Sequence, residues 1–306
     1  MSNREKLFFI NERNEELEFS SDSPYHVNIN DVSGLSDIRN EIFSITGMGQ
    51  DGSTFVGSRI ESRDIEIVGH LNETNQERAH LLRRNMNKIL NPQFSARLIY
   101  EFKNFRRVIN CTIDQAPTFA RNRIPIFEEF SLQLSCLNPF WRDDKESQHE
   151  IAAWIGGFEF PIDRPEDDLP QGLEIPIDGT WEIGWREPSL IAHVFNDGDV
   201  RAGIRIIFNA VATVQNPTLT NIITNEFLRL NLTMQAGDTI EINTAWGEKR
   251  ITLNRAGIIT DAFRYIDPES TFLQLEPGEN IFGYAAAANL DNLNVTIHHH
   301  NYFLGV

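Results

Sequence analysis

The chain has 306 residues, about twice the size of a typical domain, so its length predicts two domains. Its 41% hydrophobic and 23% charged residues are ordinary for a globular protein and exclude the fibrous and disordered classes. No stretch approaches the roughly 18 apolar residues of a membrane span, and the charged start is unlike a signal peptide. We therefore expect assembly in a cytosol and no membrane partner.

The net charge of −17 is distributed unevenly. Residues 1–142 hold 17 Lys and Arg against 19 Asp and Glu, whereas residues 143–306 hold 10 against 25. An acidic second half repels nucleic acids and anionic membranes. The arginines of the first half indicate solvated surface or ion pairs between subunits, with contact to a polyanion as the alternative.

The first pattern along the chain is "GMGQDG" at 47–52, which formally matches a dinucleotide-binding fingerprint. That fingerprint must open a helix, and here a β-branched strand pattern follows. The glycines instead predict a hairpin tip, where positive φ costs little and the loop can order against a partner. Gly47, Gly49 and Gly52 are therefore our candidate contacts to a partner or a second copy.

A helix is predicted within "LNETNQERAHLLRRNMNKILNPQ". Thr74 and Glu77 have the spacing of a capping box, and Pro92 disfavours a helical conformation at Asn91. One apolar stripe contains Leu82, Met86, Ile89 and Leu90. Strand-type alternation surrounds this helix, so we predict a small α+β domain over residues 1–141.

The end of that domain is marked by "FEEFSLQLSCLNPFWRDDKESQHE" at 127–150. Pro139 cannot donate to a strand ladder and so ends the strand. We expect Phe140 and Trp141 to pack against the first domain or at its junction with the second. Residues 142–150 contain no apolar side chain and are predicted to be a linker. Cys111 and Cys136 fall on the apolar sides of their strands and indicate buried free thiols, with a bridge between neighbouring strands as the alternative.

Residues 151–306 show short alternating segments separated by turns such as "QAGD" and "EPGEN", which predict an antiparallel β-sandwich without a convincing helix. In "IHHHNYF", only His298 and His300 would share a strand face, so a metal site is disfavoured. The chain has no nucleophile elbow, phosphate-binding loop or metalloprotease motif. We expect no enzyme activity, no metal and no cofactor.

The stretch from Cys136 to Trp141 resembles the end of the N-terminal domain in distal tail proteins of long-tailed bacteriophages, with Asn138 in place of the family's usual Asp. Other matches follow in the expected order: the Gly-rich hairpin with Arg63 and Gly69 behind it, the helix ending at Asn91-Pro92, "NPTLTN", "GDTIEINT", "LEPGEN" and the closing aromatic-Leu-Gly-Val. The resemblance covers nearly the whole chain.

This resemblance implies a mainly β protein in which an N-terminal ring-forming domain precedes a galectin-like β-sandwich. It implies a hexameric ring at the distal end of the tail that joins the tail tube protein to tail-tip or tail-associated lysin proteins, receptor-binding proteins and fibres. Genome DNA would pass transiently through the ring channel. The protein would reside in the virion tail tip after assembly in the host cytoplasm.

A carbohydrate-binding module is the alternative function. Galectins read sugars with His-x-Asn-Pro-Arg on one strand and Trp-Gly-x-Glu-x-Arg on another, and neither motif is complete here. Asn196 follows His193 one position late, and Glu248 and Arg250 follow Trp246 one position early. A one-residue slip on a strand moves a side chain to the opposite face, although a turn at Gly247 would weaken that objection.

Overall fold

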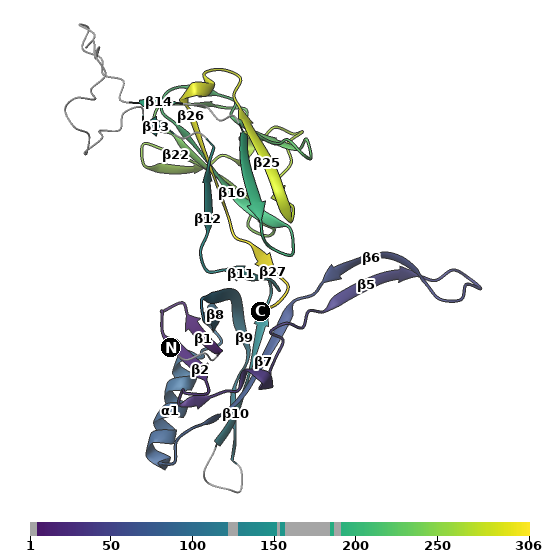
Figure 1. Cartoon of the computed structure of the whole chain (residues 1–306), viewed down its shortest axis with the longest axis vertical. Helices are drawn as coiled ribbons and strands as arrows, with labels where there is room; N and C mark the ends of the chain where they lie inside the picture. The colour runs from purple at the N-terminus through teal and green to yellow at the C-terminus, as the bar shows by residue number, and fades with distance from the viewer. Residues whose placement is uncertain (1–4, 122–127, 152–153, 157–183, 187–190) are drawn as a thin grey trace, which may run out of the picture. The chain divides into compact units, whose positions relative to one another are not determined.

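The computed structural model describes residues 5–121, 128–151, 154–156, 184–186 and 191–306 (Figure 1). The chain forms two compact units. Unit 1 contains residues 1–145, 198–200 and 301–306, and unit 2 contains residues 146–197 and 201–300. The fold is mainly β, as the alternating patterns predicted, and the first unit is barrel-like.

The strands of unit 1 close into a barrel with the neighbour order β10-β7-β3-β2-β1-β8-β9, because β9 also pairs with β10. Short strand β4 pairs with β7, and β11 and β27 extend the sheet beyond β9. The barrel strands are β1 (Lys6–Asn11), β2 (Glu16–Ser20), β3 (Tyr25–His26), β7 (Arg63–Leu71), β8 (Ala96–Phe102), β9 (Phe105–Arg121) and β10 (Glu128–Cys136). The additional elements are η1 (Ile29–Asp31), β4 (Val32–Ser33), β5 (Asn40–Ile45), β6 (Thr54–Ile60), β11 (Trp141–Asp143) and β27 (Tyr302–Phe303).

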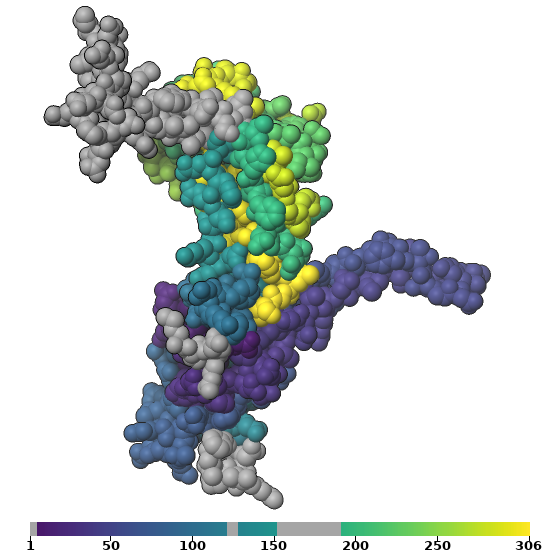
Figure 2. Space-filling model, in the orientation of Figure 1, coloured from purple at the N-terminus to yellow at the C-terminus, as the bar shows by residue number. Residues whose placement is uncertain are grey.

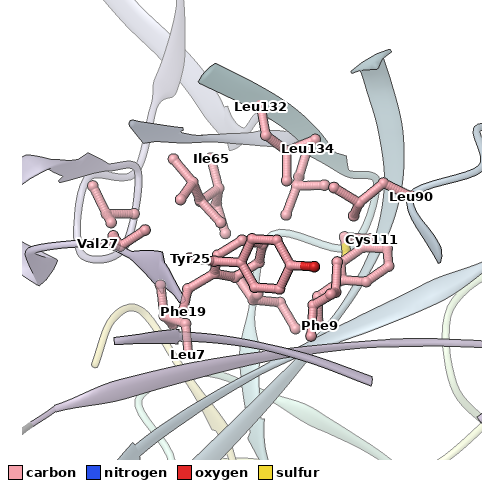
Figure 3. Close-up of a cluster of buried hydrophobic side chains, with 14 of the residues drawn as sticks. Leu7, Phe9, Phe19, Tyr25, Val27, Ile65, Leu90, Cys111, Leu132 and Leu134 are labelled. Carbon is pink, nitrogen blue, oxygen red and sulfur yellow. The ribbon is translucent and has the colours of Figure 1, made fainter. Parts of the chain in front are cut away.

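The interior of the barrel is a continuous apolar cluster that includes Phe9, Phe19, Ile65, Leu132 and Leu134 (Figure 3). On β7 and β10 every second side chain is buried, as a strand with one face on a core requires. Gly69 lies where no side chain fits, because a Cβ there would approach the His26 carbonyl oxygen to 2.5 Å.

Helix α1 (Gln76–Ile89) packs on this core through Met86, with Ile89 and the following Leu90 also buried. The predicted stripe is confirmed, but the predicted cap at Thr74 is wrong. The side chain of Asn75 accepts hydrogen bonds from the backbone N–H groups of Glu77 and Arg78, at 2.9 and 3.3 Å. Asn is a strong N-cap residue, and here it lies one position closer to the first turn. Within the described part of the chain, no helix is long and apolar enough to cross a membrane.

The chain returns to unit 1 at its last six residues. Strand β27 pairs with β11, bringing Phe303 opposite Trp141. Two strands cover parts of the segment 142–150: β11 pairs with β9, and β12 (Ser147–Glu150) pairs with β26. A strand ladder is formed by backbone N–H and C=O groups, so residues with polar side chains can pair in this way. The unit boundary therefore falls after Lys145, and residues 301–306 do not group with the sandwich.

Unit 2 consists of antiparallel sheets, each with one buried face. The larger sheet has the order β12-β26-β16-β21-β22-β23, with β24 also paired to β16, and the smaller has the order β15-β25-β18-β19. The strands are β15 (Ile191–Asn196), β16 (Ala202–Ala210), β18 (Thr218–Asn221), β19 (Phe227–Arg229), β21 (Thr239–Asn243), β22 (Arg250–Arg255), β23 (Ile258–Asp261), β24 (Gln274–Leu275), β25 (Gly278–Ala285) and β26 (Leu293–His299). Two short pairs, β13 (Trp154–Gly156) with β14 (Gly184–Arg186) and β17 (Val214–Gln215) with β20 (Thr233–Met234), complete it, and its helical turns are η3 (Phe263–Tyr265) and η4 (Leu290–Asn292).

The sandwich core follows the alternation predicted from the sequence. On β16 the side chains of Ile204, Ile206 and Phe208 are buried, and on β21 those of Ile240 and Ile242. The intervening positions face outward. In the described part of unit 2, helical structure is limited to 3-10 turns.

Candidate assembly surface

Strands β5 and β6 form a hairpin that extends away from the barrel of unit 1 (Figures 1 and 2). Its tip carries the glycines singled out above. Gly49 and Gly52 have φ of +77° and +80°, a conformation that glycine adopts without steric cost. The Gln50 side chain accepts a 3.0 Å hydrogen bond from the Gly47 N–H and donates a 3.1 Å bond to the Thr54 hydroxyl. The three glycines therefore shape a closed, exposed tip.

The hairpin exposes large apolar side chains on both of its faces. Cross-strand partners share a face, so Phe55 lies with Ser44 on one side and Ile45 lies with Thr54 on the other. The exposed apolar set of the hairpin consists of Ile42, Phe43, Ile45, Met48, Phe55 and Val56. The only ion pair described on the hairpin joins Arg59 to Glu41 at 2.6 Å. Large exposed apolar side chains therefore occupy both faces of the hairpin.

A two-stranded hairpin without a covered face is marginally stable in water. Contiguous exposed apolar surface on a folded protein commonly marks an interaction site. The hairpin of unit 1 meets both conditions. The geometry therefore points to a segment that becomes covered by another molecule.

The segment that follows β10, residues 137–141, is called the chain exit, and it contributes to the core of unit 1. Trp141 is fully buried, and its indole N–H donates a 2.9 Å hydrogen bond to the Leu35 carbonyl oxygen. Phe140 is half-buried, and its N–H donates to the Asn138 side-chain oxygen at 3.2 Å. Trp141 thus packs within the core of unit 1.

The described residues do not assemble a metal centre. No group of three His, Cys, Asp or Glu among them is placed to hold a metal ion. An open cavity of about 500 Å³ in unit 1 is lined partly by Cys111, but its lining contains no His to act as a base. Cys111 and Cys136 are buried and free, as predicted.

Unit 2 carries a second exposed feature at the β21–β22 turn. Trp246 is 79% exposed, and the Lys249 ammonium lies 4.4 Å from its ring centre and 4.9 Å from that of Phe272. On the outward face beside this turn, Asn243 is opposite Arg205 on one neighbouring strand and Arg250 on the other. The turn thus places an exposed aromatic ring near three polar side chains on the adjacent strands.

The structure separates the two halves of the galectin-type motif. His193 and Asn196 lie on β15 in the smaller sheet, whereas Trp246 lies between strands of the larger sheet. Gly247, at φ +81°, forms part of a turn. The alternation of side chains along a strand therefore does not decide which way Glu248 faces. His193 instead pairs with Glu279 at 2.7 Å. Trp154, Trp181 and Trp185 are other side chains that could stack on a sugar. Trp154 and Trp185 lie on short strands, but their side chains, and all of Trp181, fall outside the described residues.

Two family models match the chain. The phage tail protein RIFT-related domain matches residues 15–136, and the siphovirus-type tail component, C-terminal domain, matches residues 197–303. No curated protein sequence matches it significantly. The two models define a tail component of siphophages, with one domain in each unit.

Solved structures share the fold over almost the whole chain. The Dit protein (gp 19.1) of phage SPP1, described as a paradigm of hub adsorption apparatus in phages that infect Gram-positive bacteria, superposes with a TM-score of 0.66 at 14% identity, over 97% of this chain and 99% of that one. Chains from the phage P2 baseplate in its activated conformation, with Ca and with Sr, give TM-scores of 0.53 and 0.52 at 10% and 9% identity, each over 97% of this chain and 98% of that one. The chain belongs to the distal tail protein family of long-tailed bacteriophages, and the predicted resemblance is confirmed.

The sequence reading identified the tip glycines but not the apolar side chains beside them. Their signal was present, since "EIFSI" and "TFV" flank the glycines and place β-branched and aromatic residues on both hairpin strands. Strand alternation normally predicts one buried face, and an exposed two-stranded arm has none.

Proposed function

We propose that this protein is a structural component of the phage tail tip that forms a hexameric ring through unit 1. The ring joins the tail tube to tail-tip, lysin-type and receptor-binding proteins, and its channel admits the genome. The protein acts through assembly and has no catalytic role. The apolar hairpin β5–β6 carries the proposal, because it offers a long contact surface that its own chain leaves uncovered.

The hairpin is assigned to the neighbouring copy in the ring. A hairpin that projects from one side of a subunit makes a head-to-tail contact, and such contacts close into rings when the rotation between copies permits it. The near balance of charge in residues 1–142 avoids strong repulsion between adjacent copies. Gly47, Gly49 and Gly52 then form the tip that orders against the neighbour.

The acidic unit 2 is assigned to attachment. Its excess of carboxylates keeps it soluble and favours encounter with basic partner surfaces. The protein is accordingly located at the tail tip of the virion. Phe140 lies where the chain leaves the ring-forming domain for the attachment domain.

Native mass spectrometry and electron-microscope class averages test the ring. Sixfold species are expected for the protein alone or with its tail partners, and Ile42→Asp with Ile45→Asp should abolish them. Leu81→Asp is the matched control, since Leu81 on α1 is 62% exposed, as is Ile42. A protein that stays monomeric and also fails to join tail-tip partners contradicts the proposal.

Carbohydrate binding by unit 2 is a second candidate, supported by the exposed Trp246 ring and the polar row beside it. An indole face stacks on apolar sugar faces, while amide and guanidinium groups bond to hydroxyls. Glycan-array binding by the full chain that is lost with Trp246→Ala, and kept with Phe195→Ala in the smaller sheet, would support it. Equal binding by both variants would refute this site.

A further inference from the structure

Arg63 is the first residue of β7, directly after the hairpin, and its side chain connects three segments far apart in sequence. Its Nε donates to the Pro139 carbonyl oxygen at 2.8 Å. Its Nη1 donates to the carbonyl oxygens of Gly34 and Leu35, at 2.7 and 2.8 Å, and its Nη2 donates to that of Leu304. Only 2% of Arg63 is exposed.

The carbonyl groups that Arg63 binds lie outside the strands. Residues 34–35 precede the hairpin, Pro139 is in the chain exit, and Leu304 follows β27. Carbonyl groups in such positions lack ladder partners and need another donor when buried. The planar guanidinium supplies several donors from one fixed plane. One side chain therefore provides hydrogen-bond donors to carbonyl groups of three irregular segments.

The segment before the hairpin is held tightly on both sides. Gly34 has φ +83°, and a Cβ there would lie 2.1 Å from the Asp64 carbonyl oxygen, next to Arg63. The backbone N–H of Glu61 donates to the Arg39 carbonyl oxygen at 3.0 Å and closes the hairpin base. We call residues 34–39 and 61–64 the hairpin root.

The last residues of the chain dock on the same root. The Ser36 hydroxyl donates to the Val306 backbone oxygen at 3.0 Å, and a Cβ on Gly305 would lie 3.1 Å from the Ser36 Cα. The Leu304 N–H donates to the Asp199 carboxylate at 2.9 Å. The docked segment thus contacts the root directly and also through Arg63.

We propose that Arg63 is a positioning residue that couples the hairpin root to the docked segment 301–306, so that each stabilises the ordered conformation of the other. Loss of the segment removes an acceptor from the buried guanidinium and a partner from Ser36, which loosens the root. Because coupling is reciprocal, loosening the root also releases the segment. Resting on the proposed function, this coupling makes the ring contact of the hairpin depend on residues 301–306.

Hydrogen exchange of the full chain, at dilutions where it is monomeric, tests the coupling separately from ring formation. Deletion of residues 303–306 should speed exchange in the root by about tenfold or more, since it removes the charge-assisted bond from Arg63 to Leu304 together with the contact between Ser36 and Val306. Arg63→Met should speed exchange both in the root and in residues 301–304. The combined variant should show less than the sum of the two single effects, because the bond from Arg63 to Leu304 is lost in both single changes. Amides of β21 in unit 2 should exchange at the wild-type rate throughout.

Three further variants keep the result interpretable. Ser36→Ala removes one contact of the docked segment without deleting it and should give a smaller change of the same sign. Arg63→Lys, which retains the charge but not the fork, should recover part of the protection. Arg59→Met, at an exposed position of the hairpin, is the matched control and should leave the exchange rate of the root unchanged.

Root exchange at the wild-type rate in the deletion variant, or independent effects of deletion and Arg63→Met, would overturn the coupling. If the deletion loosens the root but sixfold rings form normally, the coupling stands and the hairpin is not the ring contact. If wild-type protein never forms rings while the exchange results hold, only the proposed function fails.

Discussion

The indole N–H of Trp141 donates a 2.9 Å hydrogen bond to the carbonyl oxygen of Leu35, joining the chain exit to the segment before the hairpin. Both residues are buried in the same core. The aromatic residue that follows the last barrel strand of unit 1 therefore also contacts the segment that leads into its projecting hairpin.

Trp141→Phe should destabilise unit 1 by about 0.5–1.5 kcal/mol, because it removes one of two donors to the Leu35 carbonyl oxygen, Arg63 Nη1 being the other, and keeps most of the packing. Trp141→Ala should cost about 3–5 kcal/mol, since a cavity is added. Denaturant unfolding, followed as a separate transition for each unit, measures both values. Trp246→Ala is the exposed control, and a similar loss from that change would show that burial of Trp141 is not the cause.

Gly34→Ala should destabilise unit 1 more than Gly49→Ala. Both glycines have positive φ, at +83° and +77°, so each alanine carries about 1–2 kcal/mol of left-handed strain. Only Gly34 also faces a backbone oxygen, 2.1 Å from its added Cβ, and this overpacking adds roughly 1–3 kcal/mol. Thermal unfolding of the two variants under one buffer condition checks the order. Equal losses would mean that the loop moves away from Asp64 without cost.

The sequence allowed prediction of the elements whose side-chain period is set by a core. Helix α1, the strands of the sandwich and the buried positions of both cysteines follow from apolar spacing, and these elements are found. Asn75 replaced Thr74 as the cap because adjacent residues of similar capping ability cannot be ranked without the backbone geometry.

The contacts around Arg63 were beyond sequence reasoning for a different reason. The guanidinium binds backbone carbonyl groups, and these groups are present at every position, so no residue type signals which of them is the partner. The pairing of β27 with β11 likewise joins segments about 160 residues apart, and such pairing is set by topology. The segment 142–150 has no apolar side chain whose spacing could signal a strand, and its two strands are defined by backbone pairing alone.

The two thiols should be unreactive in the native protein. Hydrogen bonding to Cys136 and burial raise the pKa of the Cys111 thiol well above its ordinary value, and the thiolate is the reactive form. A chromogenic disulfide reagent at pH 8 should therefore react slowly with the native chain and rapidly with both thiols after denaturation. Leu137→Cys, at a highly exposed neighbouring position, should react at once and serves as the control. Fast reaction of the native wild-type chain would contradict the buried environment.

Asp238 should make unit 2 sensitive to acid. Burial raises the pKa of its carboxyl group, but hydrogen bonds from Arg255 and the Gln235 N–H, with the Arg255 charge, outweigh it, so the pKa lies below the ordinary range. The stabilising contribution is therefore present above the ordinary Asp pKa and is lost as the pH falls through the lowered folded-state value. At pH 7, Asp238→Asn should cost about 1–3 kcal/mol of unit 2 stability.

The measurement for Asp238 is urea unfolding of wild type and Asp238→Asn between pH 7 and pH 3, with about 3.9 as the unfolded-state reference pKa. The difference in stability between the two proteins should shrink as the pH falls, because protonation removes from the wild type what the substitution has already removed. Glu41→Gln, in the exposed pair with Arg59, should show almost no difference at any pH. A constant gap between wild type and Asp238→Asn would mean that the amide disturbs packing and that the carboxylate charge contributes nothing.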